Sequence, residues 1–76
     1  MYRYQRLIKE AKEKVANNEI DEAIKLYRES ISLKETKDAY FDIAQLYIDK
    51  RDYKNAIVML KNLKYLFTEK EIGRNK

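Results

Sequence analysis

The sequence predicts an all-α protein of two antiparallel helix-turn-helix hairpins, stacked as a short α-α solenoid. Apolar residues recur at steps of three and four along four segments, which is the period of amphipathic helices. The chain holds one Gly and no Pro, too few for the many tight turns of a sandwich or barrel. The pattern of the first two segments also returns in the last two, which indicates an internal repeat.

The first hairpin is expected to have helices near residues 3–17 and 20–33. The apolar stripe of its first helix is Tyr4, Leu7, Ile8, Ala11 and Val15. The stripe of its second helix is Ile20, Ala23, Ile24, Tyr27 and Ile31. Between them, Asn17 and Asn18 tolerate left-handed backbone and suit a tight turn.

The second hairpin is expected to have helices near residues 37–50 and 53–67. Thr36 precedes the first of them as a candidate N-cap. Thr68-x-x-Glu71 has the form of a capping box and predicts the start of a fifth helix, an incomplete capping helix over 69–76. The connections are three to four residues long, so consecutive helices should be antiparallel neighbours.

Alanines mark the repeat. Ala11 and Ala23 are twelve residues apart, as are Ala44 and Ala56, and the second pair follows the first by 33 residues. Two helix axes approach to about 8–10 Å, at the short end of this range where the side chains at the crossing are small. We therefore predict that Ala11 packs against Ala23, and Ala44 against Ala56, where the helices of each hairpin cross.

This arrangement resembles the tetratricopeptide repeat family. The second repeat carries its pattern as Tyr40-x2-Ile43-Ala44-x2-Tyr47 followed by Ala56-x3-Leu60. The first carries part of it, as Leu7-x2-Glu10-Ala11-x2-Lys14 followed by Ala23-x3-Tyr27. The resemblance implies one domain over 1–76, with repeat one at about 4–36 and repeat two at about 37–68. An alternative is the three-helix domain of microtubule-interacting and trafficking proteins, which binds a partner helix.

Catalysis is not expected, because the chain has no His, no Cys and no Gly-rich loop. We therefore predict no catalytic residue, no metal site and no cofactor. The longest apolar run, residues 56–60, is far too short to cross a bilayer, and the N-terminus has no signal-peptide pattern. A cytoplasmic protein with no membrane association is expected.

Charge leaves a second function class open. Residues 1–14 and 61–76 each carry a net charge of +3, and the middle carries −2. Basic ends with seven tyrosines could bind nucleic acid by stacking bases. However, four of the tyrosines occupy core positions of the repeat, and acidic residues interrupt the basic ones. The four are Tyr27, Tyr40, Tyr47 and Tyr53. We therefore favour a protein or peptide partner and keep nucleic acid as an alternative.

The resemblance implies that a peptide or helical segment lies in the concave groove formed by the first helix of each repeat. The matching groove residues are Gln5, Ile8, Lys12, Val15, Asp38, Phe41, Asp42, Gln45, Ile48 and Asp49. Ile8, Phe41 and Ile48 stand off the core stripe, and exposed apolar residues rimmed by charge usually mark an interaction site. The alternative is that these three only thicken the core.

The missing third repeat predicts self-association. Repeat arrays bury a continuous core only when neighbours stack, and the fourth helix has no following hairpin. The apolar residues left for a homodimer contact are Ile57, Val58, Leu60, Leu63, Tyr65, Leu66 and Phe67. The simplest arrangement is a two-fold dimer in which this strip meets itself.

Overall fold

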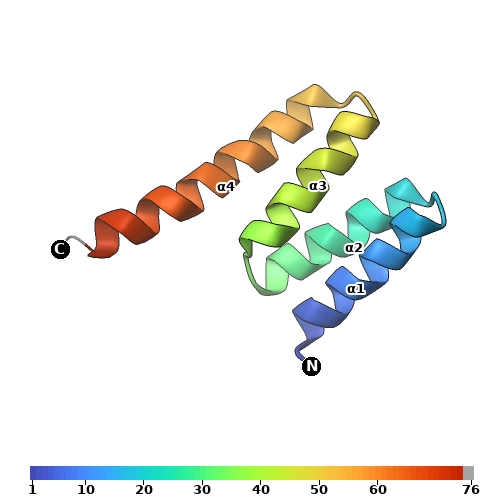
Figure 1. Ribbon diagram of the computed structural model, residues 1–76, viewed down its shortest axis with the longest axis horizontal. Helices are drawn as coiled ribbons and strands as arrows, with labels where there is room; N and C mark the ends of the chain where they lie inside the picture. The colour runs from blue at the N-terminus through green and yellow to red at the C-terminus, as the bar shows by residue number, and fades with distance from the viewer. Residues whose placement is uncertain (75–76) are drawn as a thin grey trace.

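The computed structural model describes the backbone of residues 1–74 and the side chains of residues 1–68, and the fold is all-α. The helices are α1 (Arg3–Ala16), α2 (Ile20–Leu33), α3 (Lys37–Asp49) and α4 (Tyr53–Arg74). Helix α1 packs against α2, α2 against α3, and α3 against α4. They form one layer with Cα extents of 45 × 32 × 15 Å, and α4 runs out beyond the other helices (Figure 1). The predicted fold class is confirmed.

The two hairpin turns share one geometry. Asn18 has φ 62° and Arg51, 33 residues later, has φ 63°, so both take the left-handed conformation. The next amide in each turn donates to a carbonyl five residues back: Glu19 N to Lys14 O at 2.8 Å, and Asp52 N to Tyr47 O at 2.8 Å. These bonds satisfy carbonyls that the helix end would otherwise leave unpaired. The internal repeat is therefore repeated in the backbone as well as in the sequence.

Helix starts in the second hairpin are capped by side chains. The hydroxyl of Thr36 accepts a hydrogen bond from the amide of Ala39 at 3.3 Å, as the sequence predicted. At the start of α4, the Asp52 carboxylate accepts from the Asn55 amide at 3.4 Å and from its side-chain Nδ2 at 2.7 Å. These bonds fix where α3 and α4 begin.

Small residues occupy the centre of both hairpins. Ala11, Ala23, Ala44 and Ala56 are all buried, with at most 2% of their surface exposed. Ser30 is also fully buried, and its hydroxyl donates to the Tyr4 carbonyl at 2.8 Å, which links α2 to the first turn of α1. A buried hydroxyl costs little when it is hydrogen-bonded in this way.

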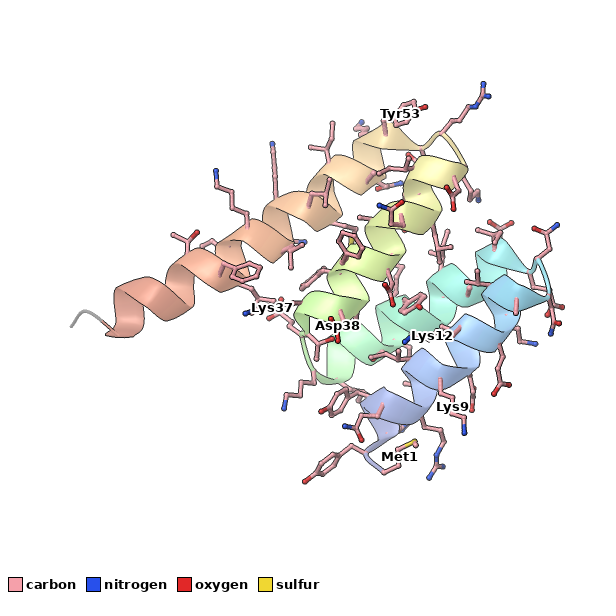
Figure 2. The ribbon with its side chains drawn as sticks, in the orientation of Figure 1. Met1, Lys9, Lys12, Lys37, Asp38 and Tyr53 are labelled. Carbon is pink, nitrogen blue, oxygen red and sulfur yellow. The ribbon has the colours of Figure 1, made fainter. Side chains whose placement is uncertain are left out.

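Three sequence predictions are wrong. No break occurs at Thr68: its hydroxyl donates to the Lys64 carbonyl at 2.8 Å inside the helix, and α4 continues to Arg74 instead of starting a fifth helix. Residues 75–76 lie outside the described part. The three-helix alternative fails because residues 1–74, which the structure describes, form four helices. Tyr53 is not a core residue: it is 57% exposed and points outward beside the second turn (Figure 2).

Candidate functional site

A hollow of about 320 Å³ lies between α1 and α3, with α2 behind it. Its lining residues are Lys12 and Val15 from α1, Tyr27 from α2, and Asp42, Gln45, Leu46 and Asp49 from α3. In Figure 2 the Lys12 side chain points toward α2 and α3, whereas Lys9, one turn earlier, points away from the other helices. The helices thus form an open groove on one face of the layer.

Helical spacing explains why these residues meet. Asp42, Gln45 and Asp49 follow one another at steps of three and four, so they share one side of α3. Lys12 and Val15 are related in the same way on α1. Because α1 and α3 are the first helices of the two hairpins, the repeat turns their equivalent sides toward the same groove.

A hydrogen bond joins the back of the groove to its α3 wall. The Tyr27 hydroxyl donates to Asp42 Oδ2 at 3.0 Å. Burial raises the pKa of the Tyr27 hydroxyl well above its usual range, and the negative charge of Asp42 raises it further. Tyr27 therefore stays a neutral donor at physiological pH, and its bond orients the Asp42 carboxylate.

The α3 wall is acidic. Asp42 and Asp49 line the hollow, and Lys12 is the cation opposite them. Within the part of the chain whose side chains are described, neither carboxylate forms an ion pair. Val15 and Leu46 supply apolar surface between them. An apolar base with an acidic wall favours a ligand with an apolar anchor and a positive charge.

The hollow brings together half of the groove residues predicted from the sequence. Those that line it are Lys12, Val15, Asp42, Gln45 and Asp49. Ile8 and Ile48 are half-buried and pack against the core cluster, in agreement with the alternative that they thicken the core. Gln5 and Phe41 are exposed, and Gln5 Oε1 accepts from the Tyr2 amide at the start of α1. Asp38 lies at the N-terminus of α3, beside a separate hollow that Leu66 also lines. Their role in binding stays a prediction.

Sequence reasoning missed Tyr27 and Leu46 as groove residues. Tyr27 was expected only in the core and Leu46 was assigned no role, and both are buried, with 2% and 5% of their surface exposed. A buried tyrosine usually finds a hydrogen-bond partner for its hydroxyl, and Asp42 is the partner here. The need of a buried tyrosine hydroxyl for a hydrogen-bond partner could have indicated that Tyr27 lies beside the polar groove. The repeat pattern alone does not say which acidic residue is that partner.

A second surface runs along α4. Of the residues predicted for self-association, Ile57, Val58, Leu60, Tyr65 and Phe67 are exposed, and Leu63 and Leu66 are half-buried. Lys37 Nζ lies 3.9 Å from the centre of the Phe67 ring, a cation–π contact that ties α4 to the start of α3. Large apolar side chains left in water on one helix usually mark a contact surface.

The described residues contain neither a candidate metal site nor a membrane-spanning helix. Among them, no group of three or more His, Cys, Asp or Glu side chains could hold a metal ion. No helix in the described part is long and apolar enough to cross a membrane. The groove supplies apolar surface, two carboxylates, of which Asp42 is oriented by Tyr27, and one ammonium group.

Two hairpins of equal turn geometry at a 33-residue period define a helical-hairpin repeat protein. Residues 38–66, most of the second hairpin, match the family model described as tetratricopeptide repeat, which confirms the resemblance to that family. Repeats of this family act in general as protein-interaction modules and are typically not enzymes. No curated protein and no solved structure matches the chain.

Proposed function

We propose that this chain is a protein-interaction module whose groove between α1 and α3 binds a short helical or extended segment. The segment carries an apolar anchor and at least one Lys or Arg. The observation that carries the proposal is the hollow itself, which combines Val15 and Leu46 with two carboxylates that no described cation pairs. Its volume of about 320 Å³ suits one or two apolar side chains.

The charge of the ligand follows from the α3 wall. Asp42 is half-buried and held by Tyr27, so a ligand cation meets a carboxylate whose position is already set. Little side-chain entropy is then lost on binding, which favours affinity. Phe41, one turn from Gln45 on α3 and half exposed, is available to extend the apolar contact.

A pair of labelled peptides tests the proposal. Both have the same Leu anchors, and one has Lys where the other has Glu. Fluorescence anisotropy should show binding of the Lys peptide only. Binding should weaken by roughly tenfold in Asp42→Asn with Asp49→Asn, because two lost charge pairs of about 0.7 kcal/mol each at a partly exposed site sum to about 1.4 kcal/mol.

Glu10→Gln with Glu13→Gln is the matched control. It removes the same charge from exposed positions of α1 that do not line the hollow, and binding should be unchanged. Equal binding of the Lys and Glu peptides, or equal losses in the two variants, would contradict a charge-selective groove.

The remaining predictions keep their own tests. A nucleic-acid binder should lose affinity for a labelled oligonucleotide when Arg3, Arg6, Lys61 and Lys64 are removed, with a steep salt dependence.

Self-association through α4 is favoured by its five exposed apolar side chains, and sedimentation tests it. Cytoplasmic location is likewise proposed, and a fluorescent fusion checks it.

A further inference from the structure

The two surfaces just described have opposite charge. The α3 wall of the groove holds Asp42 and Asp49, whereas α4 between Tyr53 and Thr68 has three lysines and no acidic residue. The lysines are Lys54, Lys61 and Lys64. Within the described side chains, none of these charges forms an ion pair. The groove therefore has carboxylates without described cation partners, and α4 has lysines without described acidic partners.

One side of α4 has the composition that the groove requires. Ile57, Leu60, Lys61 and Lys64 are spaced at i, i+3, i+4 and i+7, so they share one side of the helix. Ile57 is 51% exposed and Leu60 is 41% exposed. Two apolar anchors beside two lysines match an apolar base beside two carboxylates.

From this complementarity we infer that α4 of a second copy of this chain occupies the groove between α1 and α3. The inference rests on the proposed function, because it names the ligand of the same groove. Leu60 of one copy enters the hollow against Val15 and Leu46 of the other. Lys61 and Lys64 face Asp42 and Asp49 there. A reciprocal exchange related by a two-fold axis closes the assembly as a dimer.

Charge also decides between this contact and α4 packing on itself. In a strip-to-strip dimer, Lys61 and Lys64 of both copies share one interface, and no acidic residue lies between Tyr53 and Thr68 to offset them. Juxtaposed like charges disfavour such a contact. The groove offers the same apolar side chains an interface with carboxylates, so it is the better site for α4.

The chain exposes more surface than a compact monomer of its mass, as expected if part of that surface is covered by a second copy. The accessible surface is 5834 Å², whereas a compact folded monomer of 9.2 kDa has about 4,900 Å². The difference of about 900 Å² is comparable with the roughly 800 Å² that each partner contributes to a standard interface. Figure 1 shows the source of much of this surface, since α4 extends away from the rest of the layer.

Charge-reversed variants of the full chain test the inference by sedimentation velocity at tens of micromolar. The native chain should dimerise. A groove variant, Asp42→Lys with Asp49→Lys, and a helix variant, Lys61→Glu with Lys64→Glu, should each be monomeric. An equimolar mixture of the two should associate again, because the native groove of one chain meets the native α4 of the other. Arg6→Glu with Lys9→Glu, exposed on α1, is the control and should dimerise like the native chain.

Each other outcome overturns the inference. A groove variant that still dimerises shows that the α4 strip meets itself, and a mixture that stays monomeric shows that the charges act indirectly. Circular dichroism confirms folding, and the milder pair Asp42→Asn with Asp49→Asn repeats the test if charge reversal unfolds the chain. If the native chain is a monomer and still binds the Lys peptide, the contact with α4 is refuted and the proposed function of the groove is retained. Peptide binding that ignores the Asp→Asn changes refutes the groove itself.

Discussion

The two hairpins have the same construction and very different burial. Positions 33 residues apart are equivalent, yet Ile24 of α2 is 7% exposed and Ile57 of α4 is 51% exposed. Tyr27 is 2% exposed, and its equivalent, Leu60, is 41% exposed. This difference in burial comes from the neighbouring helices. Helix α2 is covered by α3 of the following hairpin, whereas no described element covers α4 in the same way. Burial in a repeat array is thus a property of the neighbour as much as of the residue.

The two ends of the layer also differ from each other. The outer side of α1 is polar, with Arg6, Glu10 and Glu13 all exposed. Helix α4 instead exposes apolar side chains between lysines. The exposed side chains of α1 and of the described part of α4 therefore differ in polarity.

The largest expected effect is the difference in the free energy of unfolding lost when Ile24 and Ile57 are each truncated to Ala. Ile24→Ala removes a buried side chain between α2 and its neighbours and should cost about 2–5 kcal/mol. Ile57→Ala at the equivalent position should cost about 1 kcal/mol or less, because half of that side chain is already in water. Urea unfolding at low protein concentration, where association does not contribute, measures both. Equal losses would mean that α4 is as well covered as α2 and would break the comparison.

A smaller effect is expected at the crossing of the second hairpin. Ala44 is 1% exposed, so Ala44→Leu adds a large side chain where there is no room and should cost about 1–3 kcal/mol. Ala16→Leu, at an exposed position of α1, is the control and should leave the thermal melt nearly unchanged. A melt unaffected by Ala44→Leu would show that the α3–α4 crossing lies elsewhere.

Sequence patterns predicted the features that depend on local chemistry. The 3.6-residue period placed α1, α2 and α3, and the hydroxyl of Thr36 marked the start of α3. The same rules misplaced the end of α4, because Thr68 can bond a carbonyl of its own helix as well as cap a new one. A side-chain hydroxyl has both options, and the choice depends on the following turn.

The groove was less predictable, because its geometry depends on contacts between helices. Lys12, Val15 and three α3 residues that the repeat pattern placed in the groove line one hollow, and their role in binding stays a prediction. It did not indicate that Tyr27 of α2 reaches Asp42, a contact between residues fifteen positions apart. Nor did it separate Phe41, which is half exposed, from Ile48, which packs on the core. Spacing places a residue on a helix face, but packing between helices decides what that face meets.

The smallest expected effect compares the two hairpin turns. Asn18 and Arg51 hold the same left-handed conformation, with φ 62° and φ 63°, and in both the Cβ approaches a carbonyl oxygen. Asn tolerates this better than Arg, because its short polar side chain can hydrogen-bond to the nearby backbone. Arg51→Gly removes that crowding and should stabilise the fold by about 0.5–1 kcal/mol after the greater entropy of glycine in the unfolded chain is subtracted. Asn18→Gly should change stability by only a few tenths of a kcal/mol. Thermal unfolding of both variants is the measurement, with Arg51→Lys as the control that alters the side chain and keeps the strain. A lower midpoint in Arg51→Gly would mean that the Arg51 side chain contributes more than its backbone conformation costs, and that the two turns, alike in geometry, are stabilised by different interactions.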